Sequence, residues 1–127
     1  MTAEVGATRH SLSVADLATW VRRSAALIAE HAEELTDLDA AIGDADHGTN
    51  MKRGLAAAAE AVQAGSFTSV DTLLKKVGTT LVSTVGGAAG PLYGTFFLRT
   101  GGALSGQDGI DARALAAGLE AGIGGIA

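Results

Sequence analysis

The chain has 127 residues, enough for one domain with a buried core, and its lack of cysteine excludes disulfides, thiolate-bound metals and thiol nucleophiles. Nine Lys and Arg against fourteen Asp and Glu give a net charge of −5, so we expect no nucleic-acid partner, because neutralising phosphates requires a basic face. The first ten residues contain no apolar run, so no signal peptide is predicted and we expect a cytoplasmic protein.

One segment is long enough to raise the question of a membrane helix. No charged residue lies between Lys76 and Arg99, a length that could cross a bilayer. Several glycines and Pro91 interrupt this segment, whereas a spanning helix would be apolar throughout. We therefore expect a soluble chain with no membrane partner.

The first predicted helix runs from about residue 13 to 36. Ser13 can cap it, and the carboxylate of Asp16 would lie near the positive end of the helix dipole. Apolar residues then recur at spacings of three and four, which indicates one buried helix face. The members of this face are Val14, Leu17, Val21, Ala25, Ile28, Ala32 and Leu35.

Four further helices are predicted, over about residues 49–64, 70–85, 91–101 and 111–126. Gly65 is placed to end the second helix, Pro91 to stand in the first turn of the fourth, and Asp111 to cap the last. The expected inward face of the last helix is Leu115, Leu119, Ile123 and Ile126. No segment alternates clearly enough to predict a strand. The predicted fold class is therefore all-α.

Residues 38–51 form the densest group of polar side chains between two helices. Asp39, Asp44 and Asp46 carry the carboxylate oxygens that Mg²⁺ prefers. Asp39 can join the other two only if residues 40–43 fold back, which Gly43 permits. Three close carboxylates repel each other unless a cation lies between them. The spacing therefore predicts a divalent-metal site.

A helix start follows these acids directly. Gly48 and Asn50 open the second helix, whose free N–H groups and positive dipole end attract anions. A metal site beside an anion site is typical of a bound nucleotide polyphosphate. The glycine cluster 86–90 before Pro91 repeats the arrangement and could hold another part of the ligand through backbone N–H groups. Simpler interpretations remain open: a solvated acidic loop, a helix break at the glycines, and a local capping role for His47.

Two motifs resemble one known family. They are Ile42-Gly43-Asp44-Ala45-Asp46-His47-Gly48-x-Asn50-Met51-x-Arg53-Gly54, preceded by Leu38-Asp39, and Gly86-Gly87-Ala88-x-Gly90-Pro91-Leu92-Tyr93-Gly94-Thr95-Phe96-Phe97. Both are similar to the nucleotide-binding L subunit (DhaL) of dihydroxyacetone kinases. The resemblance implies an antiparallel barrel of eight amphipathic helices. About five of these fall in residues 1–127, which we expect to be a single domain whose C-terminal part is missing.

The resemblance also implies a set of site residues. Asp39, Asp44 and Asp46 match the ligands of two Mg²⁺ ions. The matches to the phosphate-binding segment are His47, Gly48, Thr49 and Asn50, and those to the glycine-rich loop are Gly87, Ala88 and Ala89. The family commonly has serine where this chain has Ala89, so one hydroxyl contact to phosphate is lost or supplied elsewhere. No catalytic nucleophile is expected.

The implied function is a phosphoryl relay. ADP would stay bound as a cofactor and be rephosphorylated by the phosphohistidine of a phosphotransferase-system (PTS) M subunit. The resulting ATP would donate its phosphoryl group to dihydroxyacetone held on a K subunit. Two alternatives are kept: the nucleotide domain of an ATP-dependent dihydroxyacetone (glycerone) kinase, and a non-catalytic helical interaction module. Homodimerisation is also left open.

Overall fold

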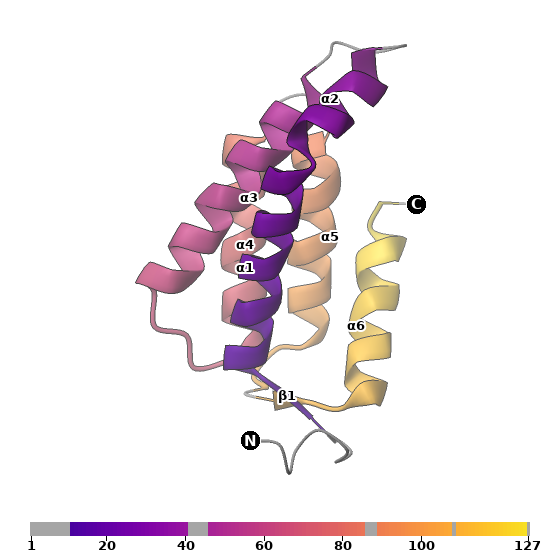
Figure 1. Ribbon diagram of the computed structural model, residues 1–127. Coiled ribbons are helices and arrows are strands. Elements are labelled where there is room, and N and C mark those ends of the chain that lie inside the picture. Colours follow the sequence, from indigo (N-terminus) through magenta and orange to yellow (C-terminus); the bar gives the residue numbers. More distant parts are fainter. Residues whose placement is uncertain (1–10, 41–45, 86–88, 108, 127) are drawn as a thin grey trace, which may run out of the picture.

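The computed structural model describes residues 11–40, 46–85, 89–107 and 109–126. These residues form six helices and one pair of two-residue strands (Figure 1), which confirms the all-α class. In chain order the elements are β1 (Leu12–Ser13), α1 (Val14–Glu30), α2 (Ala32–Ala40), α3 (His47–Ala64), α4 (Val70–Thr84), α5 (Ala89–Ala103), β2 (Gly109–Ile110) and α6 (Ala112–Gly124). No helix of the described residues is both long and apolar enough to cross a bilayer.

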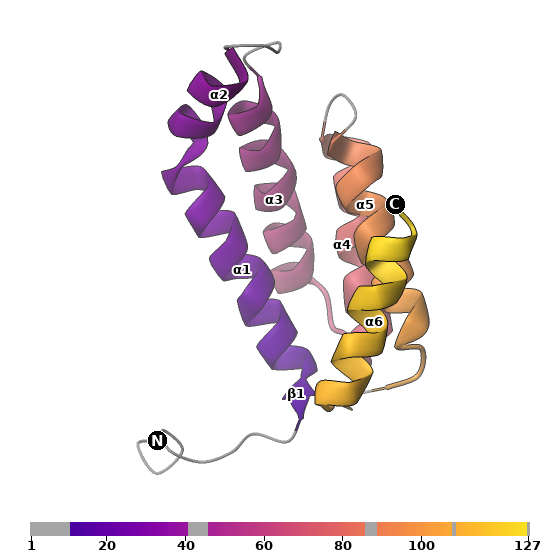
Figure 2. The ribbon, with the colours of Figure 1, turned by 90° about the vertical axis from the view of Figure 1, so that its right-hand side faces the viewer.

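The long helices form an antiparallel row. The order across the row is α1, α3, α4, α5, α6, and α2 packs against α3 (Figures 1 and 2). As a result α3 and α5 begin, and α4 ends, at one end of the molecule. At the opposite end β1 pairs antiparallel with β2, with Leu12 opposite Ile110. The starts of α3 and α5 therefore share one end of the bundle.

Local capping explains where two of the helices begin. The Ser13 hydroxyl accepts from the Asp16 amide at 3.1 Å, and the Ser13 amide donates to the Asp16 carboxylate at 2.8 Å, which is a complete capping box. The Asp111 carboxylate accepts from the Ala114 amide at 2.8 Å at the start of α6. Both predicted caps are confirmed.

The core is centred on α4. Its side chains Leu73, Val77 and Leu81 are fully buried, and they meet apolar side chains from α1 and α3. Each such side chain contributes about 1.5–3 kcal/mol when it leaves water. The core therefore stabilises α3 and α4. These two helices meet where α3 begins and α4 ends.

The boundaries of the first helical segment were predicted wrongly. It divides at His31 into α1 and α2, so six helices replace the five expected, and it continues to Ala40 instead of about residue 36. After the break α2 packs against α3, so closely that the carbonyl of Ala32 occupies the place a Cβ of Gly48 would take. Neither glycine nor proline stands at position 31 to indicate the break.

Several other helix ends differ from the expected ones by one or two residues, and two short strands were not expected. α5 begins at Ala89, two residues before Pro91, which still stands in the first turn as expected. The strands β1 and β2 were not predicted, because two residues are too few to show an alternating pattern.

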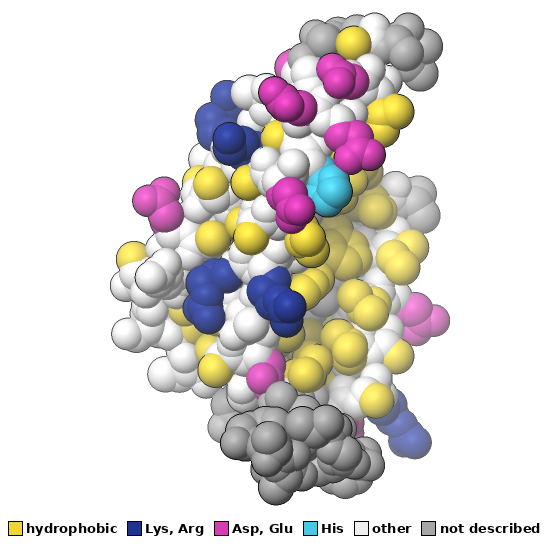
Figure 3. Space-filling view, in the orientation of Figure 1, with side chains coloured by type: hydrophobic (Ala, Val, Ile, Leu, Met, Phe, Trp, Pro, Cys, Tyr) yellow, Lys and Arg dark blue, Asp and Glu magenta, His cyan; other side chains and the backbone are white. Residues whose placement is uncertain are grey.

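The inward face predicted for the last helix was right at Leu115, which is half-buried and packs against the core, and wrong at its isoleucines. Ile123 is 57% exposed, and α6 instead packs on α5 through Gly118 and Gly122. Leu115 and Leu119 line a groove of about 370 Å³ together with Trp20 of α1. Figure 3 shows hydrophobic side chains gathered between α1 and α6. A periodic pattern locates an apolar face but does not say which neighbour it meets.

Candidate functional site

Asp39 lies where the sequence predicted, at the start of α3. Its carboxylate oxygen Oδ2 accepts hydrogen bonds from the backbone amides of Asp46, at 3.0 Å, and His47, at 3.3 Å. The end of α2 therefore lies beside the start of α3, which is the closeness of Asp39 and Asp46 that the metal interpretation requires. These amides are among the donors that a helix leaves unpaired at its N-terminus. Asp39 thus caps α3 from seven and eight residues upstream.

The carboxylate oxygens of Asp39 and Asp46 are of the kind that bind a divalent cation. Oδ2 of Asp39 takes both amides, and the other oxygen of this carboxylate has no hydrogen bond to a described residue. Asp46, whose amide Asp39 accepts from, is exposed. Hard oxygen ligands suit Mg²⁺, and they offset the positive dipole end of α3. Among the described residues no three acidic or histidine side chains gather as a metal site. Asp44, the third predicted ligand, lies outside the described residues.

The four residues predicted to bind phosphate point in different directions. Gly48 is buried against α2, where the Ala32 carbonyl leaves no room for a side chain. His47 is half-buried and lines an apolar cavity of about 300 Å³ with Tyr93 and Phe97. Neither the capping role nor the ligand role of the His47 ring is supported by a hydrogen bond from its side chain to a described residue.

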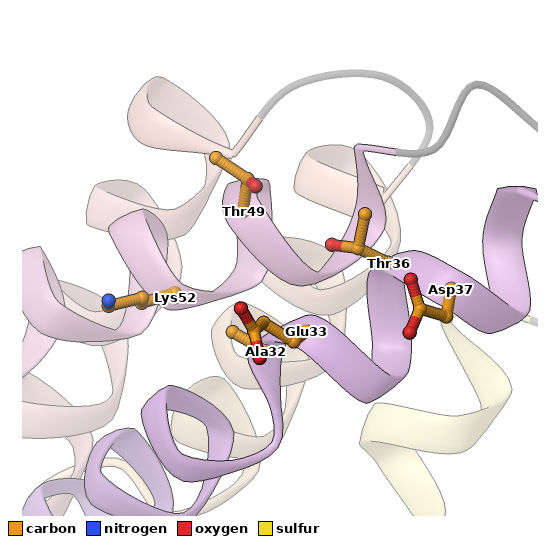
Figure 4. Close-up of a pocket in the computed structure, with 6 residues that line it drawn as sticks. All are labelled: Ala32, Glu33, Thr36, Asp37, Thr49 and Lys52. Atoms are coloured by element: carbon orange, nitrogen blue, oxygen red, sulfur yellow. The ribbon is translucent and has the colours of Figure 1, made fainter.

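Thr49 lies on the side of α3 that faces α2. It lines a cavity of about 560 Å³ between α2 and α3, together with Glu33, Asp37 and Lys52. Figure 4 shows Thr49 and Lys52 on α3 and the acidic side chains on α2. Two carboxylates make this pocket a poor one for phosphate, so Thr49 has only its backbone amide to offer the predicted anion.

Asn50 is linked to the end of α4 through Arg53, a residue for which no role was predicted. The Arg53 guanidinium donates from Nη2 to Asn50 Oδ1 at 2.8 Å and from Nε to the Thr84 carbonyl at 3.2 Å. Thr84 is the last residue of α4, close to the predicted glycine-rich loop. The available signal was the Asn-x-x-Arg spacing, because side chains three apart meet on a helix.

Of the predicted glycine-rich loop, only the end is described. Ala89 and Gly90 form the first turn of α5, and Ala89 is half-buried. A Cβ on Gly90 would lie 2.5 Å from the Val85 carbonyl, so only glycine lets α5 begin so close to α4. Gly87 and Ala88 lie outside the described residues. The described part of this loop offers backbone groups to a ligand and no charged side chain.

Comparison with known proteins identifies the chain's relatives. Residues 41–127 match the model of the DAK2 domain. The chain is 46% identical over 89 residues to the PEP-dependent dihydroxyacetone kinase, ADP-binding subunit DhaL, of Escherichia coli (strain K12), covering 70% of this chain and 42% of that protein. It is 43% identical over 107 residues to ADP-binding subunit DhaL of the PEP-dependent dihydroxyacetone kinase 1 of Listeria innocua. This match covers 84% of this chain and 54% of that protein.

A more distant relative is a larger enzyme. The chain is 34% identical over 100 residues to the L-erythrulose 1-kinase of Mycolicibacterium smegmatis, which covers 77% of this chain but 18% of that enzyme. The chain spans about half the length of the DhaL subunits that it matches. Since the family model covers more than half of the chain and includes the start of α3, the chain belongs to the DAK2 domain family.

Proposed function

We propose that this chain is the nucleotide-binding part of a dihydroxyacetone kinase and binds ADP or ATP with Mg²⁺ at the start of α3. The observation that carries the proposal is the Asp39 carboxylate held against the amides of Asp46 and His47. It brings metal-binding oxygens and an anion-binding helix start together. The similarity to subunits named ADP-binding supports the same ligand.

In this proposal Asp39, Asp44 and Asp46 hold two Mg²⁺ ions, which when bound neutralise charge on the transferring phosphoryl group. The phosphates lie against the first-turn amides of α3 that Asp39 does not take, those of Gly48 and Thr49, and against the side-chain amide of Asn50. The loop of Gly87, Ala88 and Ala89 contributes backbone groups from the other side. The protein thus positions the nucleotide, and none of its side chains acts as a nucleophile.

The finer parts of the proposal concern partners. We infer that the nucleotide receives its phosphoryl group from the phosphohistidine of a PTS M subunit and passes it to dihydroxyacetone on a K subunit, in the cytoplasm. The names of the relatives, dihydroxyacetone kinases dependent on PEP or on the PTS, support a phosphoryl donor of this class. In the alternative, a kinase of the ATP-dependent class, free ATP would be the donor.

Calorimetric titration with ADP and Mg²⁺ tests the ligand. We expect binding by the wild-type chain and its loss in the double variant Asp44→Ala, Asp46→Ala. Asp37→Ala removes a carboxylate from the neighbouring pocket and is expected to bind as the wild type does. No heat from the wild-type chain would contradict the proposal and favour the non-catalytic helical module. Phosphorylation of dihydroxyacetone by ATP without PTS proteins would favour the ATP-dependent class.

A further inference from the structure

Arg53 joins the two helix ends that frame the proposed nucleotide site. One guanidinium donates to Asn50, in the first turn of α3, and to the carbonyl of Thr84, at the end of α4. The last carbonyls of a helix have no partner within it, and the helix dipole favours a positive charge there. The contact with Thr84 therefore fixes the guanidinium itself, which in turn can fix Asn50.

The chemistry of the two groups decides which way the Asn50 amide faces. A guanidinium has five N–H donors and no acceptor, so it can bind only the oxygen of a carboxamide. The amide nitrogen, with two hydrogens to donate, must then face away from Arg53. This nitrogen is then a donor in the first turn of α3, where the backbone amides of a helix start also attract an anion.

The residue after Arg53 supports the same junction. A Cβ on Gly54 would collide with the Val85 side chain, so glycine allows α3 to approach the end of α4 at this level. Gly54 is itself buried. The separation between α3 and the end of α4 is thus set by packing at Gly54 and by the hydrogen bonds of Arg53.

We propose that Arg53 is a positioning residue for the nucleotide phosphates, which turns the amide nitrogen of Asn50 toward them and ties α3 to the end of α4. The inference rests on the proposed nucleotide function and names the residue that orients its anion contact. Arg53 acts through Asn50, and its own charge is taken up by the end of α4.

The test is calorimetric titration of the full chain with Mg²⁺ and either ADP or adenosine. Arg53→Met is expected to weaken ADP binding about tenfold or more, because the Asn50 amide would no longer be held to donate to the charged phosphates. Adenosine has no phosphate, so its binding should change little. Arg53→Lys is expected to restore little, because one ammonium cannot span both acceptors. Lys52→Met removes the same charge one residue away, on the side of the α2 pocket, and should bind ADP normally.

Asn50→Asp separates positioning from folding. It keeps an oxygen facing Arg53 but replaces the donor amide with an acceptor, so we expect weaker ADP binding with an unchanged or raised melting temperature. In a double-mutant cycle, Asn50→Ala should cost little affinity once Arg53 is methionine.

Three results would overturn the positioning role alone while the wild-type chain binds ADP: normal ADP binding by Arg53→Met, full rescue by Arg53→Lys, or additive effects in the cycle. Failure of the wild-type chain to bind ADP would instead overturn the proposed function and this inference together.

Discussion

The starts of α3 and α5 lie at the same end of the bundle, and a glycine lets each approach a neighbouring backbone carbonyl closely. Among the described residues, only the start of α3 also has charged side chains around it. In each helix the second residue is a glycine, Gly48 or Gly90, with no side chain to keep a preceding backbone carbonyl away. α3 adds Asp39, Asn50 and Arg53 around its first turn. No described side chain plays that part at α5. Close backbone approach is therefore common to both starts, whereas the ionic chemistry belongs to α3.

The largest effect is expected from filling the space at these glycines. Gly48→Ala should destabilise the protein by about 3 kcal/mol, because the new methyl would overlap the Ala32 carbonyl and the Thr36 hydroxyl. Gly90→Ala should lower the stability by about 2 kcal/mol, because the Val85 carbonyl oxygen is the single atom within 3 Å of the new methyl group. Urea unfolding measures both.

Gly102→Ala is the matched control for these variants. Gly102 lies in α5, and nothing is within 4 Å of the place its Cβ would take. Alanine there should leave stability unchanged or raise it by about 0.5 kcal/mol, through helix propensity. Equal stability of Gly48→Ala and Gly102→Ala would contradict the close approach of α2 and α3.

The second effect concerns the charged cap of α3. Asp39→Ala removes the acceptor of two backbone amides and should cost about 2 kcal/mol, at the upper end for a helix cap. Asp39→Asn keeps an acceptor oxygen and should cost about half as much, while still weakening Mg²⁺ binding. Glu60→Ala removes an exposed carboxylate from α3, and its free energy of unfolding should stay within about 0.5 kcal/mol of that of the wild type. An Asp39→Ala chain as stable as Glu60→Ala would refute the capping role.

A smaller effect is expected at Asp71, a buried carboxylate that the fold itself satisfies. The Ser69 side chain, then the Gly106 amide at 3.3 Å and the nearby Lys75, hold the pKa of Asp71 below its ordinary value, against the opposing effect of burial. Asp71→Asn should cost about 1 kcal/mol near neutral pH.

The pH dependence at Asp71 has a definite sign. Because the pKa in the folded state is lowered, the contribution to stability is fully present above the ordinary aspartate pKa of about 4. It is lost as the pH falls through the lowered value. Unfolding of the wild type and of Asp71→Asn, followed by circular dichroism between pH 7 and pH 2, should therefore converge in acid. A constant difference across this range would contradict the assignment.

Features that depend on neighbouring residues could be predicted from the sequence. Ser13 and Asp111 cap their helices as expected, and Gly65 follows the last residue of α3, because these signals act within one helical turn. The position of Asp39 beside the start of α3 was also predicted, since few residues separate the two.

Features that depend on contacts between helices could not be predicted. The break at His31 has no local signal, and α6 packs on α5 through its glycines while its isoleucines stay exposed. The contact of Arg53 with Thr84 spans thirty-one positions along the chain. A periodic pattern shows which residues share a face, but the partner of that face is set by the whole fold.

The central claim is that metal and nucleotide meet at the start of α3. The most direct measurement is amide NMR of the chain with ADP while Mg²⁺ is replaced stepwise by paramagnetic Mn²⁺. The account predicts that the amides of Asp39, Asp46–Asn50 and Ala89–Gly90 broaden first. Broadening centred on Glu33 and Asp37 in the neighbouring pocket, or spread evenly over the acidic surface, would contradict it.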